Sequence, residues 1–271
     1  MASKPKSFSS KSRAKLPPSA RPPSASALPI PVSNWDFLGT EWRFLIFGMA
    51  MAFWSSLGQT FFISLFSGQI RQTLNISHGD FGTYYAIATT ASALSLIWFG
   101  KLADTIRLEK LAMFVLGSLC CSAILFSQVS SLWMLVGGLY LLRMFGQGMM
   151  THVYTTAMAR RYVSTRGRAI SIAQLGQTLS ESIGPASIVA LLALFDWRSL
   201  WIGLPIIAFC MLAPFISYLT QRTRLQDGEG RDGLTSKQSW REKTIVSQRQ
   251  WRRSEVLRDP AFWLALIWLA A

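Results

Sequence analysis

Two residues with full charges lie inside long apolar stretches of the chain. Arg143 stands in the run LYLLRMFGQGMMTHVY, and Glu181 stands in the run AQLGQTLSESIGPASI. A charge surrounded by hydrocarbon costs several kcal/mol unless it is paired with an opposite charge or hydrated. Ionisable residues in such places are therefore candidates for an ion pair, for the binding of a charged molecule, or for proton transfer.

Each of these charges lies on a polar face of a predicted helix. Residues three or four apart share one face, which places Gln147 beside Arg143, and Gln174 on the face of Glu181. His152 stands one residue off the first face and is interpreted as a hydrogen-bonded packing residue. The remaining polar residues on the two faces are Thr151, Tyr154, Ser171, Thr178 and Ser182.

Two roles stay open for Arg143 and Glu181, which we expect to face each other or a shared aqueous cavity. They form a structural ion pair that fixes two helices, or Arg143 binds an anionic substrate while Glu181 takes part in proton coupling. Gln59, in an earlier apolar run, is a candidate for the lining of the same cavity or for a polar contact between helices.

The composition predicts that helices in a membrane position these residues. The chain has 271 residues, of which 51% are hydrophobic and only 15% are charged, against about 25% charged residues in soluble domains. Apolar runs of about twenty residues, the length that crosses a bilayer, alternate with polar connections. We expect an all-α, polytopic membrane bundle with six spans at residues 43–67, 80–99, 110–129, 132–158, 169–194 and 199–220.

The remaining segments define the expected domain organisation. Residues 1–34 form a basic tail rich in Pro and Ser, too polar to fold alone, and residues 35–220 hold the six spans. Residues 221–260 form a polar linker, and residues 261–271 begin a seventh span. Because eleven residues cover about half of a crossing, we expect the chain to be a fragment that lacks its C-terminal half.

Basic residues indicate the orientation. Twenty-four of the 27 Lys and Arg residues lie in the N-terminal segment up to Arg43, in 100–110, in 160–168 and in 221–260. Cytoplasmic connections carry the excess of Lys and Arg, so these four segments, including the N-terminus, are predicted to be cytoplasmic. We expect an integral protein of a bacterial inner membrane.

The short loop GKLADTIRLEK, residues 100–110, carries the most specific sequence signal. Gly100 permits close helix approach, and Asp104 can accept backbone N–H bonds at a helix start. Lys101 and Arg107 can pair with that carboxylate or lie near anionic headgroups. The sequence Gly-x-Leu-Ala-Asp resembles the loop signature between spans two and three of the major facilitator superfamily, although Arg107 stands where the family has a second glycine.

Further motifs resemble the same family in the same order. The R-x-x-G-Q-G sequence at Arg143 resembles its fourth-span motif, and the helix-bending pair Gly184–Pro185 resembles its fifth-span motif. Residues 196–198, Asp-Trp-Arg, and residues 257–263, LRDPAFW, also resemble family features. The resemblance implies a six-span half made of two three-helix repeats, with the 100–110 loop as a conformational latch.

The function implied by the resemblance is secondary active transport by alternating access, coupled to an ion gradient such as protons. Arg143 favours a small organic anion, such as a monocarboxylate, as substrate. A drug or metabolite antiporter is an alternative, and a non-transporting receptor or scaffold is another if the chain ends at residue 271. Five or six further encoded spans would favour transport.

The sequence gives no support for an enzymatic, metal-binding or nucleic-acid-binding function. There is no phosphate-binding loop, nucleophile–base pair or metal-ligand cluster, so we expect neither an enzyme nor a cofactor. The cysteines, Cys120, Cys121 and Cys210, lie in apolar runs without metal-type spacing. The net charge of +14 is confined to the connections, which argues for lipid and a small solute as partners and against nucleic acid.

Overall fold

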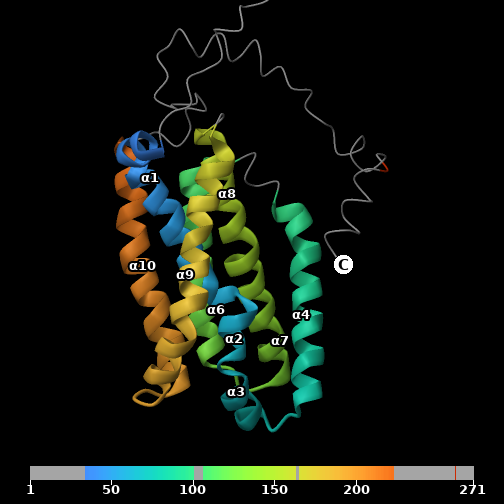
Figure 1. Ribbon diagram of the computed structural model, residues 1–271. Helices are drawn as coiled ribbons and strands as arrows, with labels where there is room; N and C mark the ends of the chain where they lie inside the picture. The colour runs from blue at the N-terminus through green and yellow to red at the C-terminus, as the bar shows by residue number, and fades with distance from the viewer. Residues whose placement is uncertain (1–33, 101–105, 163–164, 223–259, 261–271) are drawn as a thin grey trace, which may run out of the picture. The chain divides into compact units, whose positions relative to one another are not determined.

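The computed structural model describes residues 34–100, 106–162, 165–222 and 260 (Figure 1). The chain divides into two compact units, residues 1–40 and residues 41–271. Of the first unit, the structure describes only the beginning of one helix. The predicted tail, nearly all of the 221–260 linker and the seventh apolar segment lie outside the described residues, so their predicted structure stays a prediction.

The first apolar stretch is a broken helix. Helix α1 (Asn34–Trp54) continues into a 3-10 turn, η3 (Ser55–Gly58), and a short helix, α2 (Thr60–Ser64). Gln59 interrupts the helical backbone because it is extended, with φ −83° and ψ 153°. A further helix, α3 (Ser67–Leu74), ends at Asn75, which adopts the left-handed conformation common at helix C-termini.

Helix α4 (His78–Phe99) begins with a reciprocal cap. The Asp80 amide donates to Ser77 Oγ at 3.1 Å, and the Ser77 amide donates to Asp80 Oδ2 at 3.1 Å. These bonds satisfy backbone donors that a helix start leaves unpaired. Helix α6 (Leu108–Ser127) follows the loop at 100–107, of which residues 101–105 are not described.

The fourth apolar stretch is helical throughout but not uniformly α-helical. It runs through α7 (Leu132–Leu142), a π-helical segment, η4 (Arg143–Met150), and α8 (Thr151–Arg161). The wider π-helical turn begins at Arg143, the charged residue that the sequence singles out. Such π-helical segments within α-helices are frequent at functional sites.

Two long helices complete the described chain. Helix α9 (Arg166–Leu192) and helix α10 (Trp197–Arg222) are joined by a tight turn at Asp196. Arg198 donates from Nη1 to the Ser127 carbonyl and from Nη2 to the Val129 carbonyl, the latter at 2.9 Å. Arg198 thus closes the C-terminal end of α6, whose last carbonyls have no helical partner.

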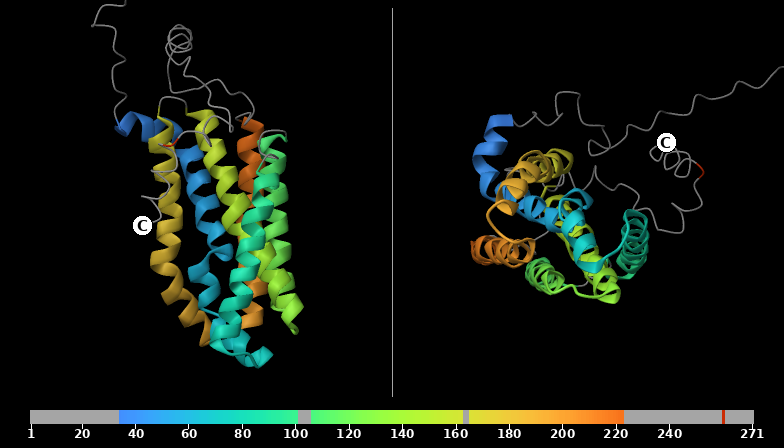
Figure 2. Two further views of the ribbon diagram at one scale, coloured as in Figure 1. Left: turned by 90° about the vertical axis from the view of Figure 1, so that its right-hand side faces the viewer. Right: turned by 90° about the horizontal axis from the view of Figure 1, so that it is seen from below.

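Within the second unit the long helices lie side by side along a common direction (Figures 1 and 2). Helix α6 has its most extensive contact with α10, and α4 packs against α7 and η4. At one end Trp201, 1% exposed, contacts the rings of Phe62, Phe66 and Phe126, with the Phe126 ring centroid 4.8 Å away. This aromatic cluster ties α2, α6 and α10 together.

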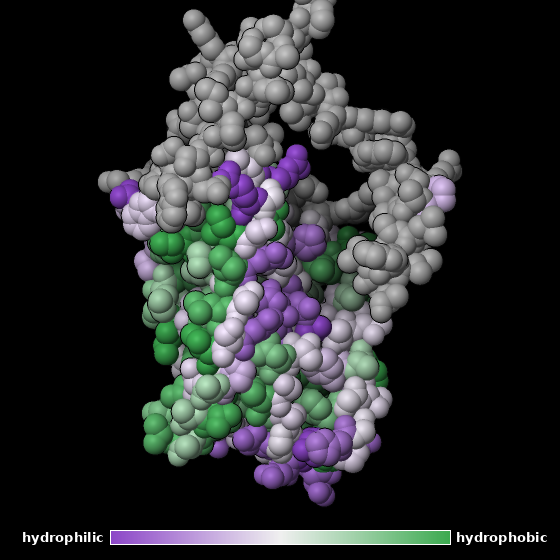
Figure 3. All heavy atoms as spheres, in the orientation of Figure 1, coloured by the Kyte–Doolittle hydropathy of each residue, from purple (hydrophilic) through white to green (hydrophobic). Residues whose placement is uncertain are grey.

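Many large apolar side chains face outward, as lipid contact requires. Trp98, Leu94, Leu175 and Met211 are each more than half exposed. Figure 3 shows hydrophobic atoms over much of one face, with polar atoms gathered in its middle. An exposed apolar surface of this extent favours burial in a bilayer or against another protein.

The prediction of an all-α chain is confirmed over the described residues, none of which forms a strand. The six predicted apolar stretches all contain helices. Among the described residues, only Leu108–Ser127 and Trp197–Tyr218 combine the length and hydropathy of a membrane-crossing helix. The first stretch is interrupted at Gln59, and η4 divides the α-helix of residues 132–161. The number of spans therefore stays a prediction.

Candidate functional site: a polar cavity beside Arg143

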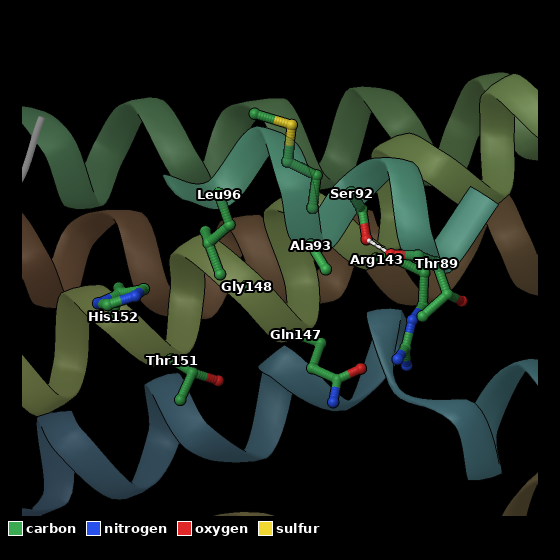
Figure 4. Close-up of a pocket in the computed structure, with 10 residues that line it drawn as sticks. Thr89, Ser92, Ala93, Leu96, Arg143, Gln147, Gly148, Thr151 and His152 are labelled. Atoms are coloured by element: carbon green, nitrogen blue, oxygen red, sulfur yellow. Dashed lines mark hydrogen bonds between the residues drawn. The ribbon is translucent and has the colours of Figure 1, made fainter. Parts of the chain in front are cut away.

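A cavity of about 310 Å³ lies between α4 and the helical stretch 132–161. Figure 4 shows Arg143, Gln147 and Thr151 directed to the same side of their helix, as the sequence periodicity predicted. The lining residues are Thr89, Ser92, Ala93 and Leu96 from α4, and Arg143, Met144, Gln147, Gly148, Thr151 and His152 from η4 and α8.

The Arg143 side chain is held by the broken first stretch. Its Nη1 donates to Thr60 Oγ1 at 3.0 Å and approaches the Gly58 carbonyl oxygen at 3.4 Å. The guanidinium carbon lies 5.5 Å from the centre of the Tyr85 ring, a distance that fits a cation–π contact. Arg143 is 9% exposed, so these contacts partly compensate a buried charge.

The backbones of η3 and η4 pack directly against each other, and two glycines make this close contact possible. A Cβ on Gly146 would stand 2.6 Å from the Gly58 Cα, and a Cβ on Gly58 would overlap the Leu142 carbonyl oxygen. Any larger residue would therefore force the two backbones apart. Gly148 also permits tight packing, since a Cβ on it would stand 3.1 Å from Leu96.

Four buried polar atoms of cavity residues have no hydrogen-bond partner within the described part of the chain. They are Thr89 Oγ1, Arg143 Nε, Gln147 Oε1 and Thr151 Oγ1. Buried polar atoms in proteins are nearly always hydrogen-bonded, and each one left unpaired costs free energy. All four atoms belong to residues of one cavity wall, so a polar molecule in the cavity would lie beside several groups that lack partners.

His152 also belongs to the cavity wall. The interpretation of His152 as a packing residue is wrong, because its side chain is exposed and lines the cavity. Its Nε2 would lie 3.8 Å from a Cβ on Gly100, at the end of α4. Helix periodicity placed His152 beside the Arg143 face, but it could not show that α4 leaves that side open.

Glu181 is not close enough to Arg143 for an ion pair. It is exposed on α9, where its Oε1 accepts a hydrogen bond from Gln177 Nε2 at 2.9 Å. No ion pair between Glu181 and Arg143 occurs among the described residues. The structural ion pair considered from the sequence is therefore wrong for this conformation, because Arg143 is turned toward Thr60 and Tyr85.

The other two glutamine candidates lie apart from the cavity. Gln59 is 7% exposed at the break between η3 and α2. Gln174 is exposed on α9, and the Tyr154 hydroxyl lies close to Gln174 and Thr151 without a hydrogen bond of standard geometry. Neither glutamine lines the cavity beside Arg143.

The loop predicted as a latch is only partly described. Gly100 closes α4, and a Cβ there would stand 2.9 Å from the Leu96 carbonyl oxygen. Arg107, with its side chain 49% exposed, pairs with Glu109 at 3.4 Å. Lys101 and Asp104 lie outside the described residues, so the latch stays a prediction.

The predicted bend at Gly184–Pro185 does not break α9, which continues through Pro185 to Leu192. A Cβ on Gly184 would make only ordinary contacts, the nearest at 3.6 Å from Phe61. Close packing on this helix requires a glycine at Gly176, because a Cβ there would overlap the Met49 carbonyl oxygen. The sequence alone does not distinguish these two glycines, because the close approach of Met49 on α1 arises only in the fold.

One charged cluster was missed from the sequence. Arg161, at the end of α8, donates from Nη2 and Nε to Glu41 Oε2 at 2.7 and 3.0 Å, and Tyr162 Oη donates to the same oxygen at 3.0 Å. The Arg161 guanidinium also lies 4.6 Å from the Phe44 ring centre. Burial, with the Glu41 charge adding to it, raises the pKa of Tyr162 well above its usual range.

This cluster ties the first and fourth apolar stretches together at the side predicted to be cytoplasmic. Glu41 and Arg161 stand 120 residues apart, and neither lies in a motif. The only signal in the sequence was that Glu41 is one of two acids, with Asp36, in a strongly basic N-terminal segment.

Comparison with known proteins decides the family. A model of the Major Facilitator Superfamily matches residues 15–271, which is most of the chain. The chain belongs to this superfamily. A search of curated proteins found no match.

Membership in the superfamily confirms several expectations. The chain is an integral membrane protein and a secondary transporter, with membrane lipid and a small-molecule substrate as its partners. Members of the family are transporters and not enzymes. Membership alone leaves the substrate, the coupling ion and the site residues undetermined.

Proposed function

We propose that this major facilitator carries a small organic anion, such as a monocarboxylate, and that Arg143 binds the anion in the cavity between α4 and η4. The observation that carries the proposal is the buried cation whose Nε has no partner within the described chain, in a cavity wall whose residues carry three more unpaired polar atoms. The cavity of about 310 Å³ is at the lower end of the range of about 300–1,000 Å³ for small-molecule sites.

Alternating access would follow from six spans arranged as two three-helix repeats. The broken stretch 34–74 would be the first helix of one repeat, and the stretch 132–161 the first helix of the other. Their irregular segments, η3 and η4, meet at Gly58 and Gly146. Interrupted helices near the bilayer midplane form the substrate sites of many secondary transporters, which supports a site at this crossing.

Ion coupling is assigned to Glu181 in this proposal. Its carboxylate is exposed on α9, on a face that also presents Gln174 and Thr178. A carboxylate that water can reach from one side at a time could take up and release a proton during the cycle. The N-terminus would lie in the cytoplasm of a bacterial cell, as the basic segments predict.

Uptake into proteoliposomes tests the proposal, with labelled propionate as the probe and an imposed pH gradient. Arg143→Ala is expected to abolish both accumulation and exchange, because the anion loses its counter-charge. Glu181→Gln is expected to keep exchange and lose accumulation, since exchange needs no net proton movement. Arg166→Ala, which removes an exposed cation outside the cavity, is the matched control and should transport normally.

The opposite results would reject the proposal. Equal uptake by wild type and Arg143→Ala would exclude the cavity as the anion site. Transport of lipophilic cations or neutral drugs, with no propionate uptake by the wild type, would favour the antiporter alternative. The absence of any transport by a well-folded wild type would favour a receptor or scaffold.

A further inference from the structure

We infer that Arg143 presents one particular edge of its guanidinium, Nε and Nη2, to a carboxylate of the substrate, and that Thr60 and Tyr85 are the residues that fix this orientation. The inference rests on the proposed function and deepens it. It states which geometry of anion the site selects and which two residues, on two other helices, set that selectivity.

The two edges of the Arg143 guanidinium are used unequally. Nη1 is already engaged, because it donates to Thr60 Oγ1 at 3.0 Å and approaches the Gly58 carbonyl oxygen at 3.4 Å. The opposite edge consists of Nε and Nη2, two N–H groups that point the same way. Nε is buried without a partner, and no hydrogen bond from Nη2 occurs within the described chain.

A free Nε/Nη2 edge matches a carboxylate. Two parallel N–H groups bind the two oxygens of a planar carboxylate together, which is stronger and more directional than a single contact. A lysine at the same position would keep the charge but lose the paired geometry. The arrangement therefore selects for a planar anion rather than for negative charge alone.

Thr60 and Tyr85 hold the guanidinium from two sides. The Tyr85 hydroxyl donates to Thr60 Oγ1 at 2.8 Å, and the Tyr85 ring centre lies 5.5 Å from the guanidinium carbon. Thr60 belongs to α2 and Tyr85 to α4, so each reaches Arg143 from a different helix. Loss of either contact would let the guanidinium rotate about its long side chain, and the free edge would lose its direction.

The remaining unpaired atoms of the cavity complete the description of the ligand. Gln147 Oε1 is an acceptor, and the hydroxyls of Thr89 and Thr151 can donate or accept. Together with one guanidinium edge they fit a molecule with one carboxylate and a small polar group, in a cavity of about 310 Å³. A single cation in the cavity matches one carboxylate and not two.

The competing explanation is that Arg143 only connects the first and fourth stretches. A purely structural arginine would need its contact with Thr60, but it would show no preference among anions. Binding selectivity therefore separates the two explanations, whereas stability does not.

Equilibrium binding to the purified protein in lipid nanodiscs is the test, with three probes of similar size. Propionate is a planar anion, ethanesulfonate has a tetrahedral head with the same charge, and propionamide is planar and neutral. The expected order for the wild type is propionate first, ethanesulfonate at least about fivefold weaker, and propionamide undetectable. Arg143→Lys should remove the preference for propionate over ethanesulfonate.

Variants of the two positioning residues test the rest of the inference. Thr60→Val removes both hydrogen bonds that Thr60 Oγ1 accepts, from Arg143 Nη1 and from the Tyr85 hydroxyl, whereas Tyr85→Phe removes only the second. Each variant should weaken propionate binding about two- to tenfold, with the larger loss for propionate than for ethanesulfonate. Thr60→Ser keeps the hydroxyl and should bind as the wild type does. Tyr84→Phe is the matched control, because this neighbouring tyrosine on α4 makes no hydrogen bond to Thr60 or Arg143.

The possible failures are distinguishable. If the wild type binds both anions equally well, or Arg143→Lys keeps the propionate preference, the edge assignment is wrong while anion transport still stands. Unchanged selectivity in Thr60→Val and Tyr85→Phe would reject their positioning role. If neither anion binds or is transported, the proposed function itself is wrong. Each variant is compared only where its melting temperature without ligand is within a few degrees of the wild type.

Discussion

At the scale of single residues, the polar side chains divide into those that the protein satisfies by itself and those that it leaves open. The Glu41 carboxylate receives three hydrogen bonds from Arg161 and Tyr162. Arg143, by contrast, has a buried Nε without a partner beside a cavity. A closed cluster of this kind serves stability, whereas an open one lining a cavity is suited to binding.

The closed cluster gives a stability prediction. Glu41→Gln leaves the Arg161 guanidinium, 17% exposed, without its counter-charge, and should cost about 3 kcal/mol of unfolding free energy. The measurement is the thermal stability of the purified protein in detergent. Glu181→Gln, which changes an exposed carboxylate, is the control and should cost less than about 0.5 kcal/mol. Equal melting temperatures for the two variants would contradict the assignment.

At the scale of elements, the periodicity of the sequence predicted the polar face of the fourth apolar stretch, but not the residues on other helices that contact it. Arg143, Gln147 and Thr151 share one side because residues four apart do so in helices close to α geometry. Thr60 and Tyr85 could not be predicted, because they reach Arg143 through tertiary packing and carry no motif. The expected pairing with Glu181 failed since a helical pattern does not fix how a helix is rotated against its neighbours.

The crossing of η3 and η4 gives a prediction at this scale. Gly146→Ala places a methyl group 2.6 Å from the Gly58 Cα. Because the clash is with backbone atoms, which cannot move aside without strain, we expect the unfolding free energy to fall by about 1–3 kcal/mol or more. Gly137→Ala on α7 meets nothing within 4 Å and should leave stability unchanged or slightly improved. The comparison is made by melting temperature and by the fraction that elutes as a single species. A Gly146→Ala variant as stable as Gly137→Ala would show that the two backbones do not approach so closely.

At the scale of the whole molecule, composition and basic-residue patterning established a membrane protein, and the family match supports the same conclusion. The helices, their order and the resemblance to the family were readable from the sequence because hydrophobic runs and short motifs are local signals. The cavity itself could not be predicted from the sequence, because its walls come from α4 and from the stretch 132–161, which meet only in the fold.

The topology is tested by labelling cells with a membrane-impermeant maleimide, in a background without Cys120, Cys121 and Cys210. Ser130→Cys lies in a connection predicted to be external and should react on intact cells. Thr105→Cys and Thr165→Cys lie in basic connections and should react only after permeabilisation. Labelling of residues 105 and 165 from opposite sides would contradict the predicted topology.

The most direct measurement of the central claim is protection of a cysteine in the cavity wall by the anion. In the same cysteine-free background, Ala93→Cys places a thiol in the lining on α4, and Ala91→Cys places one on the same helix outside the lining. Propionate should slow thiol labelling at position 93 several-fold, should leave position 91 unaffected, and should give no protection once Arg143→Ala is added. Labelling at position 93 that is indifferent to propionate, or protected equally without Arg143, would contradict binding of the anion beside Arg143.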